Sequence, residues 1–300
     1  MSRPRAAITG STTITIGELA LGVLRQHAAA FSAHAPQARA DTDPEHVHQT
    51  RVATRRMRAA IRLFADVLPP AAAALNDELR WIAGQLGPLR DLDVQVGRLH
   101  GNATSLGLSE AVEPYAAWLE SQRQCALSAL AQAFQSPRFL DLEQRLANLD
   151  TWSPNADRDR PALEEGPLRL RRAYRNLRKR ADHLDTHSPA AEFHTTRIRA
   201  KRLRYAAEFF ETLYAKPARR LVTCAVDLQD LLGDHQDGIV SSQRIHEAVQ
   251  TAAGTWPSET SLVLGRVVQW ELERGRRLRR RFPATYRQVK DAWRQLRRGL

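Results

Sequence analysis

Histidine and arginine side chains recur at helical spacing between residues 48 and 62. His48, Arg51, Arg55, Arg58 and Arg62 follow one another at intervals of three or four residues. On a helix, this spacing places all five side chains within an arc of about 80°. Guanidinium groups donate charge-assisted hydrogen bonds to phosphate or carboxylate oxygens, and an imidazole adds a further donor. The pattern therefore predicts an anion-binding surface, which we call the first cationic face.

No acidic residue interrupts this face between His48 and Arg62. Like charges at this spacing destabilise a helix by about a few tenths of a kcal/mol per pair, so a partner of negative charge is expected opposite them. The face extends over about 21 Å at 1.5 Å per residue. This length favours an extended polyanion over a single phosphate, because a row of phosphates can meet a row of guanidinium groups and release counterions.

A second cationic face follows 146 residues later. When the sequence is aligned with itself at this offset, about 50 residues match without a gap, and Phe64 falls on Phe210. The second face consists of His194, Arg197, Lys201 and Arg204. It is shorter than the first, because Glu208 stands where the first copy has Arg62. We predict a tandem duplication of a helical unit whose halves pack about a pseudo-two-fold axis.

Other matched residues are assigned supporting roles. Arg56 and Arg202 lie off the two faces and are the most obvious candidates to pair with acids, although both are kept in the predicted binding site. Asp91 and Asp237 are interpreted as helix N-caps or as acids that orient arginines, and Gly87 and Gly233 as residues that end helices. The alternative for both faces is that carboxylates of neighbouring helices neutralise them.

Helical periodicity dominates the chain, so the fold is predicted to be all-α. Asp43-Pro44-Glu45 has the composition of a helix start, and the helix is expected to run to Leu68, before Pro69-Pro70. A second helix is expected from about residue 71 to 86, with Gly87-Pro88 as its stop and a new helix from Asp91. Ser188-Pro189 is expected to open another long helix that ends near Tyr214.

These signals predict a flexible segment at 1–15, a first repeat at 16–149, a linker at 150–166 and a second repeat at 167–298. The two repeats together would form one domain over 16–298. The two cysteines, Cys125 and Cys224, form no CxxC pair, which argues against a disulfide scaffold and a zinc-thiolate site. With no signal peptide and no long apolar run, a cytoplasmic protein without membrane contact is expected.

The net charge of +12 points to a polyanionic partner. Residues 1–150 carry 15 basic and 15 acidic side chains. Subtracting these from the totals of 45 and 33 leaves 30 and 18, so the whole excess lies in residues 151–300. Part of it lies between Arg169 and Arg180, where three arginines share a predicted helix face. They are Arg171, Arg175 and Arg178.

Two HxxR-led basic helices, each followed by an LGxxxD segment, resemble the CHAD family, the conserved-histidine α-helical domain. The matching residues are His48, Arg51, Arg55, Arg56, Arg58 and Leu86 to Asp93 in the first repeat, and His194, Arg197, Lys201, Arg202, Arg204, Tyr205 and Leu232 to Asp237 in the second. The resemblance extends from about Ile16 to Trp293. It implies two pseudo-symmetric antiparallel helical bundles around a basic central groove or pore. It also implies polyphosphate binding and, in bacteria, association with polyphosphate granules.

The expected function is therefore a polyphosphate-binding module without catalytic residues, metal or cofactor. Its binding residues would be those of the two cationic faces with Arg56, Arg202, Arg171, Arg175 and Arg178. Charging of the histidines would strengthen binding at mildly acid pH. Three alternatives stay open: weak, non-specific nucleic-acid binding, metal-dependent phosphohydrolysis with His48 and His194 as ligands, and a helical scaffold that binds no polyanion tightly.

Overall fold

A computed structural model describes residues 14–40, 43–251 and 255–300. Within these ranges the chain is all-α, as predicted, and the only β-type pairing is an isolated bridge between Thr15 and Pro161. The described α-helices are α1 (Ile16–Ala40), α2 (Pro44–Leu63), α3 (Ala71–Leu106), α4 (Glu113–Gln135), α5 (Pro137–Ala147), α6 (Ala162–Ala181), α7 (Ala190–Phe209), α8 (Glu211–Thr251) and α9 (Ser258–Arg297). Short 3-10 turns occupy Glu110–Val112, Asn148–Thr151 and Ala156–Arg158.

The start of α2 is capped as predicted. The Asp43 side chain accepts a hydrogen bond from the backbone N–H of Glu45 at 2.7 Å, and Pro44 occupies the first turn, where its missing N–H costs nothing. The helix ends at Leu63, five residues before the predicted end, and the backbone N–H of Phe64 still bonds to Ala60. Phe64 and Leu68 are buried beyond the helix, which explains why the apolar spacing continues past its end.

The predicted helix break at Gly87-Pro88 is wrong. Helix α3 continues through both residues to Leu106, so Gly87 does not end a helix and Asp91 does not begin one. A proline normally disfavours helical geometry in the residue before it, partly through contact with that residue's Cβ. Gly87 has no Cβ, which removes this contact, and α3 accommodates Pro88. Gly233 and Asp237 likewise lie within α8.

The segment predicted as a linker, 150–166, contains the first turn of α6, which begins at Ala162. Its earlier part packs against the start of α1: the backbone N–H of Ile16 donates to Arg160 at 2.8 Å, and that of Gly17 donates to the Asp159 carboxylate at 2.8 Å. The long helix predicted after Pro189 ends at Phe209 rather than near Tyr214. Helix α8 follows and bends at Ala215, whose φ of 44° is not helical.

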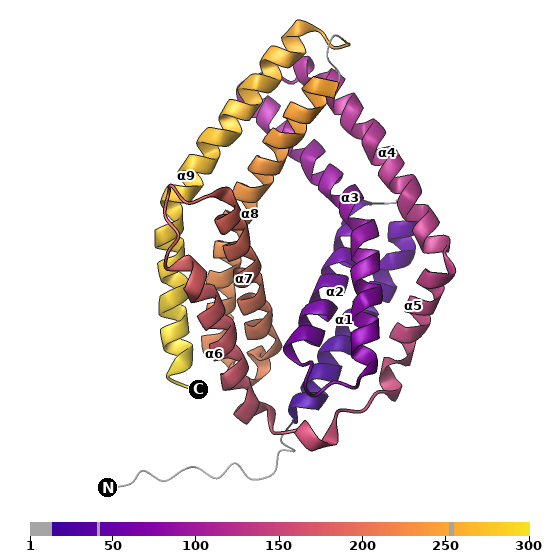
Figure 1. The fold of residues 1–300 in the computed structure, drawn as a ribbon, viewed down its shortest axis with the longest axis vertical. Coiled ribbons are helices and arrows are strands. Elements are labelled where there is room, and N and C mark those ends of the chain that lie inside the picture. The colour runs from indigo at the N-terminus through magenta and orange to yellow at the C-terminus, as the bar shows by residue number, and fades with distance from the viewer. Residues whose placement is uncertain (1–13, 41–42, 252–254) are drawn as a thin grey trace.

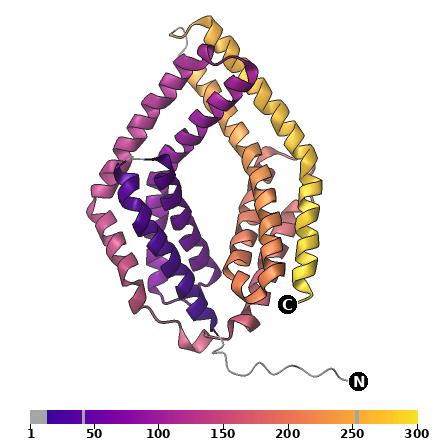
Figure 2. The same cartoon turned by 180° about the vertical axis from the view of Figure 1, so that it is seen from behind.

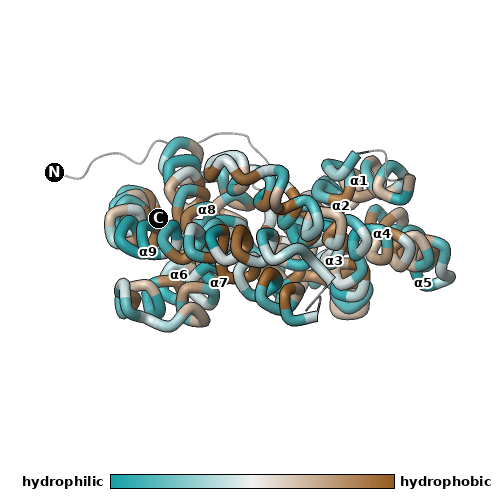
Figure 3. The backbone as a smooth tube through the Cα atoms, turned by 90° about the horizontal axis from the view of Figure 1, so that it is seen from above, coloured by the Kyte–Doolittle hydropathy of each residue, from teal (hydrophilic) through white to brown (hydrophobic). Residues whose placement is uncertain are grey.

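The helices form two groups that lie side by side (Figures 1 and 2). Helices α1, α2, α3 and α5 belong to one group and α6, α7, α8 and α9 to the other, while α4 extends from the apex down to α5. The groups meet where α2 faces α7 and, at the apex, where α3 and α4 meet α9. Helices α6 and α7 begin 146 residues after α1 and α2, which is the offset found in the sequence. Seen from above, hydrophobic and hydrophilic stretches alternate along the helices (Figure 3).

Two apolar cores hold these contacts. The larger joins both groups and includes Phe64, Phe209 and Phe210, whose rings pack at centroid distances of 5.9 and 6.0 Å. The smaller lies at the apex and includes Leu99 and Val267. None of the described helices combines the length and apolarity needed to cross a bilayer.

A buried ionic network fastens the apex beside the smaller core. Arg98 of α3 donates to Asp234 of α8 at 2.7 Å and to both carboxylate oxygens of Glu271 of α9 at 2.5 Å. Asn102 donates to Glu271 at 2.5 Å, and Arg274 contacts Asp234 at 2.9 Å. The Glu271 side chain is 1% exposed, so this network joins the two halves inside the protein.

Candidate anion-binding site

Helices α2 and α7 carry the two cationic faces. Their opposite sides are apolar: Met57 and Ile61 of α2 and Leu203 and Ala207 of α7 are buried. Burial of these sides fixes the rotation of each helix, and it leaves the basic residues on the sides that the core does not cover.

Four cations from the two halves converge where α2 approaches α7. They are Arg51 and Arg55 of α2 and Arg197 and Lys201 of α7, and we call them the central cluster. Burial, followed by repulsion from Arg197, Arg55 and Arg51, lowers the pKa of Lys201 to about 7. The pKa of Arg51 is also lowered, first by burial and then by Arg55, Arg90 and Arg197. The predicted faces therefore meet each other.

Acids offset only part of this charge. Asp91 lies 3.9 Å from Arg51, at the limit of an ion pair, and its side chain is 58% exposed. Burial raises the pKa of Asp237, although Arg197 and Lys201 are close enough to oppose this effect. Both acids lie within helices, so their predicted N-cap role is wrong, and the alternative role of orienting arginines agrees with their positions.

Gly87 and Gly233 give the arginines of the central cluster room to lie against the neighbouring helices. A Cβ atom at Gly87 would lie 3.3 Å from Nη1 of Arg51, and one at Gly233 would lie 3.2 Å from Nη2 of Arg197. Both distances are shorter than ordinary carbon contacts. The glycines therefore shape the site instead of ending helices, and the contact occurs at equivalent positions of the two halves.

The two histidines differ in their surroundings. His48 is half-buried, and its pKa is lowered first by burial and then by Arg90. His194 is exposed on α7. Arg90, which lies within the LGxxxD segment but was not among the predicted binding residues, therefore belongs beside the first face. The second copy has Gln236 at that position.

Tyr205 is a further site residue that periodicity alone did not indicate, although it lies in the matched segment of the second repeat. Its hydroxyl accepts a hydrogen bond from Nε of Arg55 at 2.5 Å. The guanidinium groups of Arg55, Arg56 and Arg204 all lie about 6 Å from the centre of its ring. Such contacts favour cations over an aromatic face, so Tyr205 helps to hold arginines of both halves together.

Glu208 neutralises two of the predicted binding residues. Its carboxylate lies 3.2 Å from Nη2 of Arg56 across the two halves, and it accepts a hydrogen bond from Nε of Arg204 at 2.7 Å. Arg56 is thus paired with an acid, as its position off the face suggested. Arg204 is also paired, so the second cationic face is shorter still than the sequence indicated.

A second group of cations, the outer cluster, continues from the first cationic face toward its C-terminal end. Its members are Arg58, Arg62, Arg80, Arg199 and Arg202. Burial lowers the pKa values of Arg58, Arg62 and Arg202, and a neighbouring arginine lowers each further. Arg202 therefore lies with cations rather than with an acid, contrary to the simplest expectation for it. Arg80 and Arg199 were not predicted, because they are off the two faces.

Three buried donors on α2 and α7 have no acceptor among the described residues. They are Nε of Arg56, Nε of Arg58 and Nε of Arg197. A buried N–H group without an acceptor costs about 1–3 kcal/mol, so each position is suited to an acceptor supplied from outside the chain.

The arginines of α6 do not join these clusters. Arg171, Arg175 and Arg178 are exposed, and Arg178 forms an ion pair with Asp182 at 3.5 Å. Arg178 also influences Tyr174 and Tyr286, which places it on the side of α6 next to α9. Within the described ranges, no three or more His, Cys, Asp or Glu side chains converge as a metal site.

Comparison with known proteins identifies related chains. The CHAD domain family matches residues 22–246. Two uncharacterized proteins from two strains of Mycobacterium tuberculosis are 31% identical over 263 residues, which cover 84% of this chain and 49% of theirs. The chain thus spans about half the length of these curated relatives.

Two solved structures share the fold. The CHAD domain from the plant Ricinus communis superposes with a TM-score of 0.74 at 25% identity, covering 96% of each chain. PptA from Streptomyces chartreusis gives a TM-score of 0.70 at 19% identity, covering 94% of this chain and all of that one. The second likeness concerns the fold alone.

Proposed function

Because this chain belongs to the CHAD domain family, we propose that α2 and α7 bind inorganic polyphosphate through the central and outer clusters. The observation that carries the proposal is the convergence of Arg51, Arg55, Arg197 and Lys201 from two halves of the chain, with acids that offset only part of their charge. The resemblance to a family associated with polyphosphate binding supports the same ligand.

The chemistry of the clusters suits a repeated phosphate. Guanidinium groups bind phosphate oxygens through paired, charge-assisted hydrogen bonds. The buried Nε–H groups of Arg58 and Arg197, which have no acceptor among the described residues, would gain one from phosphate. A single phosphate would meet one cluster only. A chain of phosphates could contact both clusters and relieve the repulsion within each of them.

We propose binding without catalysis, and a cytoplasmic location on polyphosphate granules. The phosphohydrolase alternative predicts release of phosphate from polyphosphate when Mg²⁺, Mn²⁺ or Zn²⁺ is added to purified protein. Substitution of His48 and His194 by alanine would abolish that release. Under our proposal, no metal produces release above the level of a heat-inactivated sample.

Calorimetry with polyphosphate of defined chain length tests the binding site. The Arg51→Ala/Arg197→Ala variant removes one central cation from each half, and we expect at least about a tenfold loss of affinity, since each charged hydrogen bond contributes about 1.5–3 kcal/mol. The matched control, Arg39→Ala/Arg287→Ala, removes one exposed arginine from each half outside the clusters. Equal affinity of the two variants would contradict the proposed site.

Competition separates polyphosphate from nucleic acid. Both are phosphate chains, so DNA is expected to bind weakly at low salt. Long-chain polyphosphate should displace labelled DNA at physiological salt, whereas DNA at the same phosphate concentration should displace polyphosphate poorly. The reverse order would favour a nucleic-acid ligand.

A further inference from the structure

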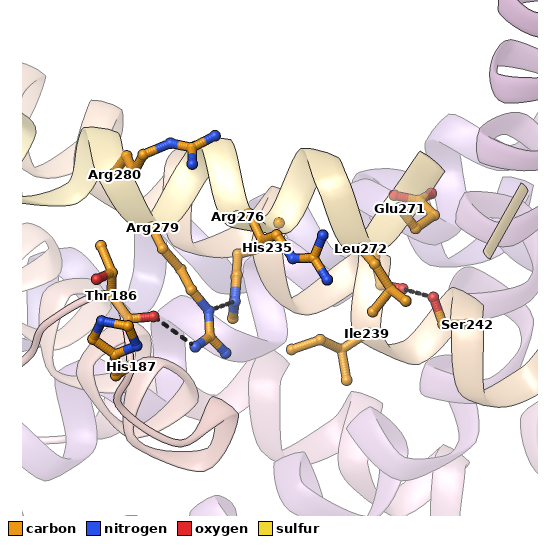
Figure 4. Close-up of a pocket in the computed structure, with 12 residues that line it drawn as sticks. Thr186, His187, His235, Ile239, Ser242, Glu271, Leu272, Arg276, Arg279 and Arg280 are labelled. Atoms are coloured by element: carbon orange, nitrogen blue, oxygen red, sulfur yellow. Dashed lines mark hydrogen bonds between the residues drawn. The ribbon is translucent and has the colours of Figure 1, made fainter. Parts of the chain in front are cut away.

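A second basic pocket lies apart from the central and outer clusters. It has a volume of about 560 Å³ and is enclosed by α8, α9 and the connection between α6 and α7 (Figure 4). None of the residues that line it belongs to either cluster. Its volume falls within the range of small-molecule sites.

Arg279 of α9 is held rigidly in this pocket. Its Nε donates to Nε2 of His235 at 3.0 Å, and its Nη1 donates to the backbone carbonyls of Thr186 at 3.1 Å and Ser188 at 2.9 Å. Its guanidinium carbon also lies 4.7 Å from the centre of the Phe193 ring. Burial, followed by repulsion from Arg279, lowers the pKa of His235 to about 4, so the imidazole is a neutral acceptor at neutral pH.

The charge of Arg279 has no counter-ion among the described residues. All four of its contacts are neutral groups, and burial lowers the pKa of Arg279 with no nearby acid to oppose it. Glu271 is the one acid in the described lining of the pocket, but Arg98 and Asn102 engage both of its carboxylate oxygens. A fixed, partly buried cation without a counter-ion is a site for an anion.

Other lining residues indicate the size and character of that anion. Arg276 lies between Arg279 and Leu272, whereas Arg280 extends from the opposite side of α9 (Figure 4). Neither arginine pairs with an acid among the described residues. Ile239 and Leu272 form an apolar wall, and Leu272 is 47% exposed. The pocket thus combines two cations with an uncovered apolar surface.

We propose that this pocket binds a small organic phosphate, namely a phosphomonoester with an apolar or aromatic body. Arg279 and Arg276 contact the phosphate, and Ile239 and Leu272 contact the body. This site is independent of the proposed polyphosphate site, and occupancy of one does not require the other.

Titration calorimetry with phenyl phosphate, supported by ligand-observed NMR, tests the proposal on the full chain. We expect binding that Arg276→Ala weakens by about tenfold, the loss of roughly one charged hydrogen bond. Arg287→Ala is the matched control, because Arg287 is an exposed arginine of the same helix outside the pocket. Inorganic phosphate should bind more weakly than phenyl phosphate, and Leu272→Ala should reduce that difference.

Three results would overturn the proposal. These are no binding of phenyl phosphate to the native protein at millimolar concentration, equal losses in Arg276→Ala and Arg287→Ala, or equal affinity for inorganic and phenyl phosphate. The Arg51→Ala/Arg197→Ala variant should bind phenyl phosphate normally even if it loses polyphosphate. Failure of one site is thereby distinguished from failure of the other.

Discussion

Arg56 of α2 and Glu208 of α7 form an ion pair of 3.2 Å between the two halves of the chain. Glu208 also accepts a hydrogen bond from Arg204 one helical turn earlier. This acid therefore links the halves and at the same time neutralises two cations that would otherwise extend the anion-binding surface.

Replacing Glu208 should separate these two effects. We expect Glu208→Gln to lower the free energy of unfolding by about 1–3 kcal/mol, because the two partners are mostly buried and lose their counter-ion. The same change should strengthen polyphosphate binding several-fold, since Arg56 and Arg204 become available. Urea unfolding and calorimetry measure the two outcomes.

Glu211→Gln is the control, because its pair with Arg219 is longer, at 3.8 Å, and exposed. Weaker polyphosphate binding in Glu208→Gln would contradict this account.

The glycines under Arg51 and Arg197 give a second prediction. Alanine is favoured over glycine inside a helix by about 1 kcal/mol, but in the Gly87→Ala/Gly233→Ala variant the new methyl groups would displace both guanidinium groups. We expect a loss of polyphosphate affinity with little change in stability. The control is Gly84→Ala/Gly265→Ala, at helical positions where a Cβ meets nothing within 4 Å. If both double variants bind alike, the glycines do not shape the site.

Lys201 should make the stability of the ligand-free protein depend on pH. Its pKa is lowered to about 7 in the folded state, first by burial, and is about 10.4 in an unfolded chain. Between these values the unfolded chain holds more protons, so the contribution of Lys201 to stability rises with pH across this window. The rise should be absent in Lys201→Met. The comparison is made by urea unfolding from pH 7 to 9. Identical slopes in the two proteins would refute the assignment.

Polyphosphate binding should also take up a proton through Lys201. The added negative charge favours the ammonium form, so binding at pH 8 should take up as much as about one proton per site. Calorimetry in two buffers of different ionisation enthalpy measures this number. Lys201→Arg keeps a charge that does not titrate near neutrality and should bind without that proton uptake. Unchanged proton uptake in Lys201→Arg would assign the proton to His48 or another group.

The buried network at the apex should contribute more to stability than any exposed ion pair. In Glu271→Gln, Arg98 keeps Asp234 but loses its bidentate partner, and we expect the free energy of unfolding to fall by about 3 kcal/mol. Glu273→Gln changes a more exposed residue of the same helix and should have little effect. Similar unfolding curves for the two variants would show that the network is not stabilising.

Sequence reasoning predicted the parts of this molecule that depend on local spacing. The Asp43 cap and the all-α fold follow from short-range patterns, and the structure has both. It failed at Gly87, because a Gly-Pro pair usually ends a helix, and the guanidinium of Arg51 on another helix gives a reason for a glycine there that local spacing cannot show. Contacts between distant segments are not visible in periodicity.

Local spacing predicted some of the binding residues but not others. The spacing that began at His48 identified the central cluster, but it could not show that Glu208 neutralises Arg204 or that Arg202 lies among cations. Arg80 and Tyr205 reach the site from positions off the two faces. Local spacing could not predict the pocket around Arg279 either, since its walls come from three separate stretches of the chain.

Arg98 and Glu271 are separated by 173 residues, so the contact that fastens the apex can form only late in synthesis. During synthesis, helix α3 leaves the ribosome long before α9 exists, and Arg98 lacks Glu271 as a partner until then. Closing so long a loop is slow compared with forming helices. The contact between α2 and α7 can therefore form before the apex network is complete, because the network needs Glu271 of α9.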